Sequence, residues 1–354
     1  MKIKCPSCSK HYKFESNRVG RKFECPECDH KFVISENDFI ESSQETVQKD
    51  GPIEEVGNYK IIKQLGTGGA GLVYLAEHPS FKIPVAIKVL DKSVCDNLNN
   101  SRRFIREAQL AASVTHPNIL RIFDAGLHES QLYYVMEYVD GGSVAQTMED
   151  QGLCFTEAEC FEVALAITSA LKEAHKSSIV HRDIKPDNIM CTKDGEYKLA
   201  DLGLAKIHDQ ELSTASLTGI HSAMGTPYFM PPEQALDAKQ ADIRSDIYAL
   251  GVSLYQLSTG KLPFTGKNAT QIFHQQINKN PLSPQILEPK LSDHFTQIIL
   301  TCLQKNPDDR FQNPTELELV LRTTPKAYFP VQDIILVCVL LTFVICTCLI
   351  LFFL

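Results

Sequence analysis

The hydrophobic and polar positions form distinct patterns along the chain. From Tyr59 to about Arg322, short alternating apolar runs come first and longer helical patterns follow. This order predicts an α+β domain with strands in its first part and helices in its second. Residues 334–354 contain no charged side chain. As a helix, these 21 residues would be about 31 Å long, enough to cross a hydrocarbon core of about 30 Å.

This apolar segment is interpreted as a transmembrane helix. A buried core helix is the alternative, but such a helix usually has a polar face. Arg322 and Lys326 precede the segment, and positive side chains favour the cytoplasmic side of a membrane. We therefore expect a single-pass protein of the cell (inner) membrane whose domain faces the cytoplasm, with residues 323–333 as the juxtamembrane linker.

Residues 1–34 form a basic head with two similar cysteine pairs, Cys5-Pro-Ser-Cys8 and Cys25-Pro-Glu-Cys28. Each pair predicts a turn followed by a strand. Two C-x2-C turns at this spacing can present four thiolates to one tetrahedral zinc ion. Because the head has few apolar residues, the metal would supply its folding free energy. The head resembles the zinc ribbons of some bacterial proteins.

Two other interpretations of the head stay open. One C-x-x-C pair could be a redox dithiol, although no βαβ pattern surrounds it. His11 or His30 could replace a thiolate as a zinc ligand. Residues 35–57 hold seven acidic side chains against Lys49 alone, which predicts a flexible, solvated linker after the head.

The composition excludes several protein classes. With 354 residues, 44% of them hydrophobic and 22% charged, the chain is globular rather than disordered. A net charge of -8 is not typical of a dedicated nucleic-acid binder, so we expect no nucleic-acid partner. The twelve cysteines are clustered rather than evenly spread, which fits a reduced compartment with one metal site.

A glycine-rich run follows the first predicted strand of the domain. Gly66, Gly68 and Gly71 form G-x-G-x-x-G, and β-type residues continue after Gly71. The glycines therefore predict a hairpin turn rather than the start of a helix in a dinucleotide fold. Side chains at these positions would collide with a phosphate chain beneath the turn. Lys88, which ends the short strand Val85-Ala86-Ile87-Lys88, strengthens this interpretation.

Together with the run Ile179-Val180-His181-Arg182-Asp183-Ile184-Lys185-Pro186-Asp187-Asn188, these motifs make residues 59–322 resemble the eukaryotic-type (Hanks-type) Ser/Thr protein kinases of bacterial style. The resemblance implies a bilobal fold, with a small β-rich N-lobe at 59–138 and a larger helical C-lobe at 141–322. It also implies ATP and Mg²⁺ (or Mn²⁺) as cofactors.

The resemblance assigns roles to the residues of the catalytic loop. Asp183 would orient the substrate hydroxyl and accept its proton, while Lys185 would contact the γ-phosphate. Asn188 would hold one magnesium ion, and Asp201 of Asp201-Leu202-Gly203 would bind the magnesium that bridges the phosphates.

The resemblance also implies how the nucleotide is held. Glu107 would pair with Lys88 so that the ammonium reaches the α- and β-phosphates. Backbone groups of Glu137 and Val139 would bond the adenine, and Met136 would line the back of its pocket. The residues expected to contact the nucleotide are Leu65, Gly66, Gly68, Gly71, Val73, Ala86, Lys88, Met136, Glu137 and Val139.

Further positions match the family in structural roles. Glu233 is expected to pair with Arg310, and Asp246 to brace the backbone of the catalytic loop. The chain departs from the family pattern at Leu202, where phenylalanine is usual, and at Pro231, where alanine is usual. Both replacements look compatible with the fold.

A regulatory site is expected in residues 204–224. Arg182 could pair with a phosphate there, and the candidate phosphorylation sites are Thr218, which we favour, Ser216 and Thr214. The alternative is that these hydroxyls only keep a mobile loop polar.

Lys185 and Thr226 resemble the Ser/Thr branch of the family. The sequence therefore predicts a membrane-anchored kinase that transfers the ATP γ-phosphate to Ser/Thr hydroxyls of proteins, including other copies of itself in trans. The alternatives are a pseudokinase scaffold and a zinc-ribbon adaptor.

Overall fold

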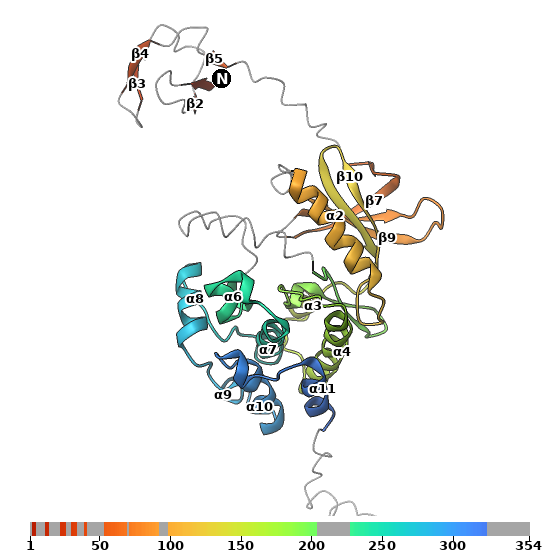
Figure 1. The fold of residues 1–354 in the computed structure, drawn as a ribbon, viewed down its shortest axis with the longest axis vertical. Helices are drawn as coiled ribbons and strands as arrows, with labels where there is room; N and C mark the ends of the chain where they lie inside the picture. Colours follow the sequence, from red (N-terminus) through yellow and green to blue (C-terminus); the bar gives the residue numbers. More distant parts are fainter. Residues whose placement is uncertain are drawn as a thin grey trace, which may run out of the picture. The chain divides into compact units, whose positions relative to one another are not determined.

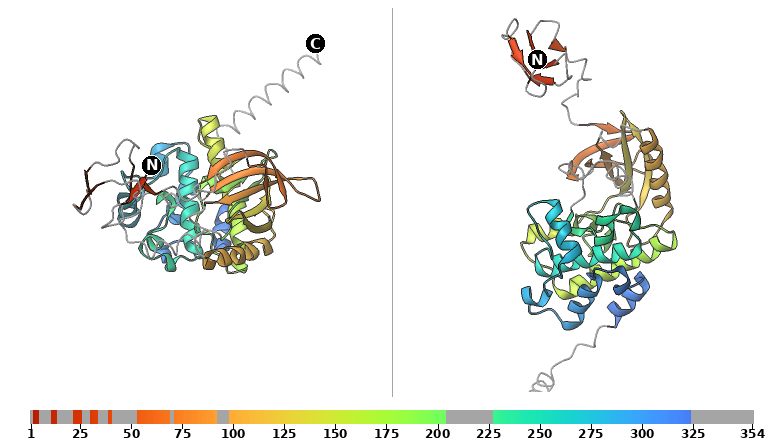
Figure 2. Two further views of the ribbon diagram at one scale, coloured as in Figure 1. Left: turned by 90° about the horizontal axis from the view of Figure 1, so that it is seen from above. Right: turned by 60° about the vertical axis from the view of Figure 1, so that its left-hand side comes forward.

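The computed structural model describes residues 2–4, 11–13, 22–25, 30–33, 39–40, 53–68, 71–91, 98–203 and 227–323. The chain divides into two compact units, Met1–Ile53 and Glu54–Leu354, and each is described by itself. Figure 1 and Figure 2 show the ribbon.

The N-terminal unit contains two short hairpins. Strand β1 (Lys2–Lys4) pairs antiparallel with β2 (His11–Lys13), and β3 (Lys22–Glu24) pairs antiparallel with β4 (Lys31–Val33). Each hairpin encloses one cysteine pair in the sequence, and the strand expected after each pair is present. Cys25 is buried, and its N–H donates to the carbonyl of His30 at 3.0 Å. Cys5, Cys8 and Cys28 lie outside the described residues, so the zinc site stays a prediction.

The expected linker at residues 35–57 is wrong in two places. Strand β5 (Phe39–Ile40) pairs with β1, and β6 (Glu55–Val56) pairs with β7 (Tyr59–Gly68) of the following unit. The physical reason is that apolar residues lie inside this acidic segment: Phe39 and Ile40 form β5, and Val56 is the buried residue of β6. Val56 is only 1% exposed, so the β-rich lobe begins before Tyr59.

The β-rich lobe is a six-stranded antiparallel sheet in the order β10-β11-β9-β8-β7-β6. Its other strands are β8 (Gly71–Glu77), β9 (Pro84–Leu90), β10 (Ile122–His128) and β11 (Gln131–Glu137). The glycine-rich run lies at the turn between β7 and β8, which confirms the predicted hairpin. Helix α2 (Leu98–Ser113) packs against the sheet (Figure 1).

Strand β11 shows how the sheet divides its side chains between two cores. Leu132, Tyr134 and Met136 join the main hydrophobic core, which continues into the helical lobe. Tyr133 and Val135 belong to a smaller cluster on the other face. This alternation follows from the two-residue period of a strand.

The helical lobe follows strand β11. Its helices are α3 (Val144–Gln151), α4 (Glu157–Lys176), α6 (Pro232–Leu236), α7 (Ile243–Thr259), α8 (Ala269–Asn278), α9 (Pro284–Leu287), α10 (Asp293–Cys302) and α11 (Pro314–Arg322). It also contains the hairpin β12 (Ile189–Cys191) and β13 (Tyr197–Leu199) and the 3-10 turns η3 (Pro186–Asn188), η4 (Pro227–Phe229), η5 (Ala238–Gln240) and η6 (Pro307–Asp309).

Local sequence explains where the longer helices begin. Thr156 and Glu159 form a reciprocal capping box at the start of α4, and Asp242 and Ser245 do the same for α7. Each cap contributes about 1 kcal/mol to helix stability. Helix α7 is buried along most of its length, so it forms the centre of the lobe.

A β-rich lobe followed by a helical lobe agrees with the expected bilobal architecture. Within the described residues, no helix is both long enough and apolar enough to span a membrane. The expected transmembrane segment, 334–354, lies outside the described residues.

Candidate functional site

The glycine turn gives one edge of the site. A Cβ added at Gly66 would have no other atom within 4 Å, so the turn leaves the open space that a phosphate chain requires. The expected reason for glycine at position 71 is a collision between a side chain and a phosphate chain, and the structure gives a different reason. The φ of Gly71 is +146°, and a Cβ there would collide with the carbonyl oxygen of Val89 in the neighbouring strand β9. The sheet backbone, rather than a phosphate, excludes a side chain at Gly71.

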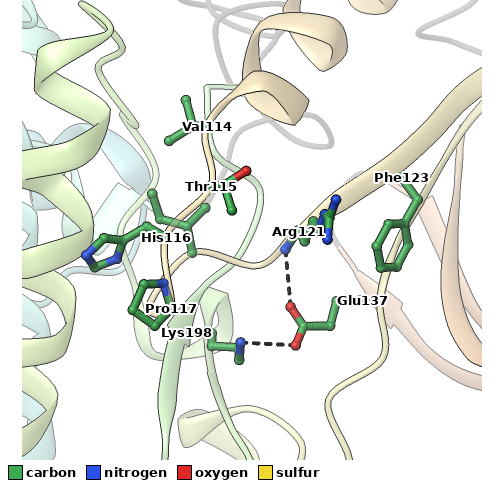
Figure 3. A pocket seen from close by; sticks show the side chains of 9 residues that line it. Val114, Thr115, His116, Pro117, Arg121, Phe123, Glu137 and Lys198 are labelled. Carbon is green, nitrogen blue, oxygen red and sulfur yellow. Dashed lines mark hydrogen bonds and ion pairs between the residues drawn. The ribbon is translucent and has the colours of Figure 1, made fainter.

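The segment that joins the two lobes, here called the hinge, begins at the end of strand β11 with Glu137. Met136 and Val139 are buried, which suits the lining of an adenine pocket. The N–H of Glu137 donates to the carbonyl of Arg121 at 2.8 Å. The Glu137 carboxylate accepts from the Arg121 N–H and pairs with the Lys198 ammonium at 3.0 Å (Figure 3). Since Lys198 lies on β13, this pair fixes the hinge to the helical lobe.

The Glu137–Lys198 pair also borders a pocket of about 350 Å³ (Figure 3). His116 and Phe123 line the same pocket. Burial lowers the pKa of His116, whose ring is hydrogen-bonded to the Ser169 hydroxyl at 3.2 Å. Of the nucleotide-binding residues expected from the sequence, Glu137 alone lines this pocket, which is therefore distinct from the expected catalytic site.

Lys88 is positioned by the register of the sheet, which pairs it with Tyr134 across β9 and β11. Its ammonium lies 2.5 Å from the Asp201 carboxylate, and the two side chains are 13% and 17% exposed. Glu107, the partner expected from the resemblance, is half-buried on α2. The Lys88–Glu107 pair stays a prediction, whereas the Lys88–Asp201 pair is a feature that the sequence analysis did not predict.

Asp201 is held from two sides. Lys88 donates to Oδ2, and the Tyr134 hydroxyl donates to Oδ1. Burial acts to raise the pKa of Asp201, but the Lys88 charge and the two hydrogen bonds outweigh it and hold that pKa below its usual value. Burial and the Asp201 charge raise the pKa of Tyr134 well above its usual value. The pair is therefore an ionised carboxylate and a protonated phenol, which fixes the phenol as the donor.

The catalytic loop assembles its three predicted residues. The Lys185 ammonium lies 2.7 Å from Asp183 Oδ2, and the Asn188 amide donates to the carbonyl oxygen of Asp183 at 2.7 Å and to its Oδ2 at 3.0 Å. Since both partners of the amide are acceptors, its nitrogen faces Asp183 and its oxygen points away. The Ala200 N–H donates to the Asn188 carbonyl at 2.8 Å, so Asn188 and Asp201 lie at adjacent ends of the β12–β13 hairpin.

The backbone of this loop is braced from behind, as predicted for Asp246. Its carboxylate accepts from the N–H groups of His181 at 2.8 Å and Arg182 at 2.7 Å. The Asp183 N–H donates to His181 Nδ1, so Nε2 carries the proton and donates to the Ala200 carbonyl at 2.7 Å. His181 therefore has a structural role in linking the loop to the residue before Asp201.

The predicted pair of Glu233 with Arg310 is confirmed. The Arg310 guanidinium donates to both carboxylate oxygens, at 2.8 and 2.7 Å, and the Ser245 hydroxyl donates to Oε1 at 2.7 Å. Burial acts to raise the pKa of Glu233, but the bonds from Arg310 and Ser245 outweigh it and lower that pKa. This pair lies within the helical lobe, where it links α6 to the residue after η6.

Three arginines surround a second pocket, of about 510 Å³. Arg102 and Arg106 come from α2 and Arg182 from the catalytic loop, while Glu107 is the one acidic residue in the lining. The pocket therefore has the charge that a phosphate group would need. Thr214, Ser216 and Thr218 lie outside the described residues.

Sequence reasoning missed the role of Tyr134 and the Glu137–Lys198 pair. A signal for Tyr134 existed, because it is two residues before Met136 and therefore shares the face of β11 that meets the site. No comparable signal marked Lys198, since its partner depends on how the hinge meets β13.

Comparison with known proteins places the chain in context. Residues 59–319 match the sequence model of the protein kinase domain family. The serine/threonine-protein kinase PrkC of Bacillus subtilis is 36% identical over 267 residues, which are 75% of this chain and 40% of PrkC. The serine/threonine-protein kinase PknB of Mycobacterium tuberculosis is 36% identical over 264 residues, which are 73% of this chain and 41% of PknB.

Among solved structures, the crystal structure of the PknI kinase domain of Mycobacterium tuberculosis is similar, with a TM-score of 0.61 and 28% identity. The similarity covers 77% of this chain and 99% of that domain. The chain spans about two fifths of the length of the curated relatives that it matches.

Proposed function

The chain belongs to the protein kinase family, and we propose that it is an active, ATP-dependent Ser/Thr protein kinase. The observation that carries this proposal is the assembly of the catalytic loop. Asp183 forms an ion pair with Lys185 and accepts a hydrogen bond from Asn188. The β12–β13 hairpin that follows brings Asp201 into an ion pair with Lys88. Phosphoryl transfer needs these groups together, because its catalysis is mainly positioning and charge stabilisation.

The geometry supports a direct transfer to a hydroxyl of a protein substrate. The Asp183 side chain is 30% exposed, so a Ser or Thr hydroxyl can reach it. The hydroxyl oxygen forms a bond to the γ-phosphorus, the bond from that phosphorus to the bridging oxygen breaks, and ADP leaves. The hydroxyl proton passes to Asp183, while Lys185 stays beside the γ-phosphate.

The residues present suit a magnesium ion, which prefers oxygen ligands. Asp201 offers carboxylate oxygens and Asn188 an amide oxygen, from adjacent ends of the β12–β13 hairpin. When bound, Mg²⁺ or Mn²⁺ would neutralise charge on the β- and γ-phosphates. The open space at Gly66 would receive the phosphate chain of ATP.

The test is phosphate incorporation by the purified full chain with ATP and Mg²⁺ or Mn²⁺. The wild type should phosphorylate itself on Ser/Thr, Asp183→Asn should be inactive, and Asp150→Asn, at an exposed position on α3, should behave as the wild type. Equal incorporation by wild type and Asp183→Asn would remove the role of Asp183. No incorporation by the wild type under any condition would favour a pseudokinase scaffold.

We further propose that a phosphate in residues 204–224, with Thr218 favoured over Ser216 and Thr214, activates the kinase by pairing with Arg182. The positive lining of the 510 Å³ pocket supports this proposal. Mapping of phosphosites, followed by activity of Thr218→Ala, tests it. Full activity of that variant would contradict the proposal and indicate that these hydroxyls only keep the loop polar.

The head is proposed to be a zinc ribbon held by Cys5, Cys8, Cys25 and Cys28. Its support is the placement of each cysteine pair between paired strands and the burial of Cys25. About one zinc ion per chain is expected, and Cys5→Ser should lose it while kinase activity remains. A metal content near zero would overturn the proposal.

Residues 334–354 are proposed to anchor the chain in the cell (inner) membrane with the kinase domain in the cytoplasm. The support is the uncharged sequence of this segment and the basic residues before it. Tethering would favour phosphorylation between neighbouring copies. Deletion of residues 331–354 should release the protein from the membrane fraction and make its autophosphorylation strongly dependent on concentration.

A further inference from the structure

We propose that Tyr134 is a positioning residue for Asp201 and that its hydroxyl forms part of the support of the magnesium site. The inference rests on the proposed function, because Asp201 is a metal ligand only if the chain binds ATP with magnesium. Tyr134 would touch neither the metal nor the nucleotide, and would act through the Asp201 carboxylate alone.

The fold places Tyr134 directly behind the site. It lies on β11 opposite Lys88 of β9, and its side chain belongs to the same core as Met136. The residue is 1% exposed. Its ring lies 6.1 Å from the ring of Phe104 on α2. A phenol in this place has little freedom to move, so its hydroxyl is a fixed donor.

The carboxylate of Asp201 has one anchor on each oxygen. Tyr134 donates to Oδ1 and Lys88 donates to Oδ2. Asp201 itself has φ of +61°, a left-handed conformation in which an aspartate is uncommon but tolerated. The backbone and both anchors together fix the direction in which the carboxylate oxygens point.

The two anchors leave room for a metal ion. An ionised carboxylate offers about four acceptor sites on its two oxygens. Tyr134 and Lys88 use one site on each oxygen. The hydroxyl can therefore orient the carboxylate without occupying the whole of Oδ1.

The two anchors differ in what happens when ATP binds. In the proposed mechanism the Lys88 ammonium is also required at the α- and β-phosphates, so its charge is shared between Asp201 and the nucleotide. Tyr134 has no such second task. It is the anchor that serves Asp201 alone when the metal site is in use.

The magnitude follows from other metal sites. Groups that hydrogen-bond a metal ligand orient it, and their loss typically costs about 10- to 100-fold in metal affinity or activity. The variant Tyr134→Phe removes the hydroxyl and keeps the ring that contacts Phe104. We therefore expect a loss of about tenfold, at the lower end of that range.

The matched control is Tyr133→Phe. Tyr133 is the neighbouring residue on the same strand, but it points to the other face and packs with Val85 and Val135. The same atom is removed in both variants. A change seen only in Tyr134→Phe is therefore due to the place of the hydroxyl rather than to its chemistry.

The experiment measures equilibrium binding of a fluorescent ATP analogue to the purified full chain, over a range of Mg²⁺ concentrations and also in EDTA. Tyr134→Phe should need about tenfold more Mg²⁺ for half of the metal-dependent gain in binding. Its binding in EDTA and that of Tyr133→Phe under both conditions should match the wild type.

The outcomes separate the two proposals. A wild type that binds the analogue equally with and without Mg²⁺ contradicts the proposed function. If the wild type responds to Mg²⁺ and Tyr134→Phe responds at the same or a lower concentration, the positioning role is wrong. Equal losses in EDTA and in Mg²⁺ would indicate a merely structural role. If Tyr134→Phe does not fold, Tyr134→Leu with Tyr133→Leu as its matched control replaces the two phenylalanine variants, and the same criteria apply.

Discussion

Two ion pairs in this molecule are both removed from solvent but differ in how their donors are used. The side chains of Arg310 and Glu233 are 0% and 9% exposed and lie within the helical lobe. Those of Lys88 and Asp201 are 13% and 17% exposed and join the β-rich lobe to the residues after β13. The first pair links parts of one lobe, whereas the second bridges two lobes at the candidate site.

The hydrogen bonds make the difference clear. Arg310 donates through Nε to the Gln304 carbonyl, through NH1 to Glu233 and the Arg244 carbonyl, and through NH2 to Glu233 and the Lys305 carbonyl. All five guanidinium donors are thus satisfied. Among the described residues, Lys88 donates to Asp201 alone, although an ammonium has three donors. The pair whose donors are all satisfied, called here the saturated pair, holds the fold, whereas Lys88 has donors left for a further partner.

The largest effect is expected when the Lys88–Asp201 pair is broken. Lys88→Met should lower the rate of phosphate transfer by at least about 10²- to 10³-fold, because it removes a cation from the phosphate-binding site. The free energy of unfolding should fall by less than it does for Arg310→Met, because the Tyr134 hydroxyl still donates to the Asp201 carboxylate. Kinase assays and urea unfolding of the same preparation check both statements. A loss of stability as large as that of Arg310→Met would contradict the comparison.

The next largest effect is expected when the saturated pair, Arg310–Glu233, is broken. Arg310→Met leaves the Glu233 carboxylate buried without its charged partner, which should cost about 3–5 kcal/mol of the free energy of unfolding. Urea unfolding followed by circular dichroism measures this cost. At a temperature where the variant is still folded, nucleotide binding should be close to that of the wild type. A stability loss below about 1 kcal/mol would contradict the structural role.

The two pairs also differ in how well the sequence predicts them. Glu233 and Arg310 were both identified, and they meet as expected. For Lys88 the sequence predicted Glu107, and the structure shows Asp201 as a partner. Motif spacing identifies the charged residues of a site. Which further carboxylates lie beside Lys88 depends on how α2 and the two lobes come together, and a local pattern does not contain this information.

Other differences have the same physical origin. The hairpin at the glycine turn is local, and it was predicted correctly. The reason for Gly71 is a contact with the neighbouring strand β9, and it was not predicted. The strand Glu55–Val56 was missed because its acidic surroundings resemble a linker, whereas its burial comes from pairing with β7.

Acid should weaken the saturated pair. The Glu233 pKa is lower in the folded protein than in the unfolded chain, where it is about 4.3. The charged carboxylate therefore contributes its stability above that pH, and the contribution is lost as the pH falls through the lower, folded pKa. The difference in unfolding free energy between wild type and Glu233→Gln should shrink as the pH decreases from about 6 to about 3. A difference that is constant or grows would contradict this assignment.

A smaller effect tests the third bond to Glu233. The Ser245 hydroxyl is buried and donates to Oε1 at 2.7 Å, while it also accepts from the Asp242 N–H at the start of α7. Ser245→Ala removes both bonds but leaves the Arg310–Glu233 pair intact. The expected loss is about 1–2 kcal/mol of unfolding free energy. A loss as large as that of Arg310→Met would show that the hydroxyl, rather than the guanidinium, holds the carboxylate.

The smallest effect comes from a pair that resembles Arg310–Glu233 in chemistry but not in burial. Arg322 donates through Nε at 3.0 Å and through NH2 at 2.9 Å to Glu318 Oε1, yet its side chain is 64% exposed. Water competes for these donors and salt screens the charges, so Arg322→Met should cost at most about 0.5 kcal/mol. Urea unfolding at low and at high salt measures this cost. If Arg322→Met cost as much as Arg310→Met, pairing alone would determine stability, and burial with full donor satisfaction would no longer explain why Arg310 holds the fold.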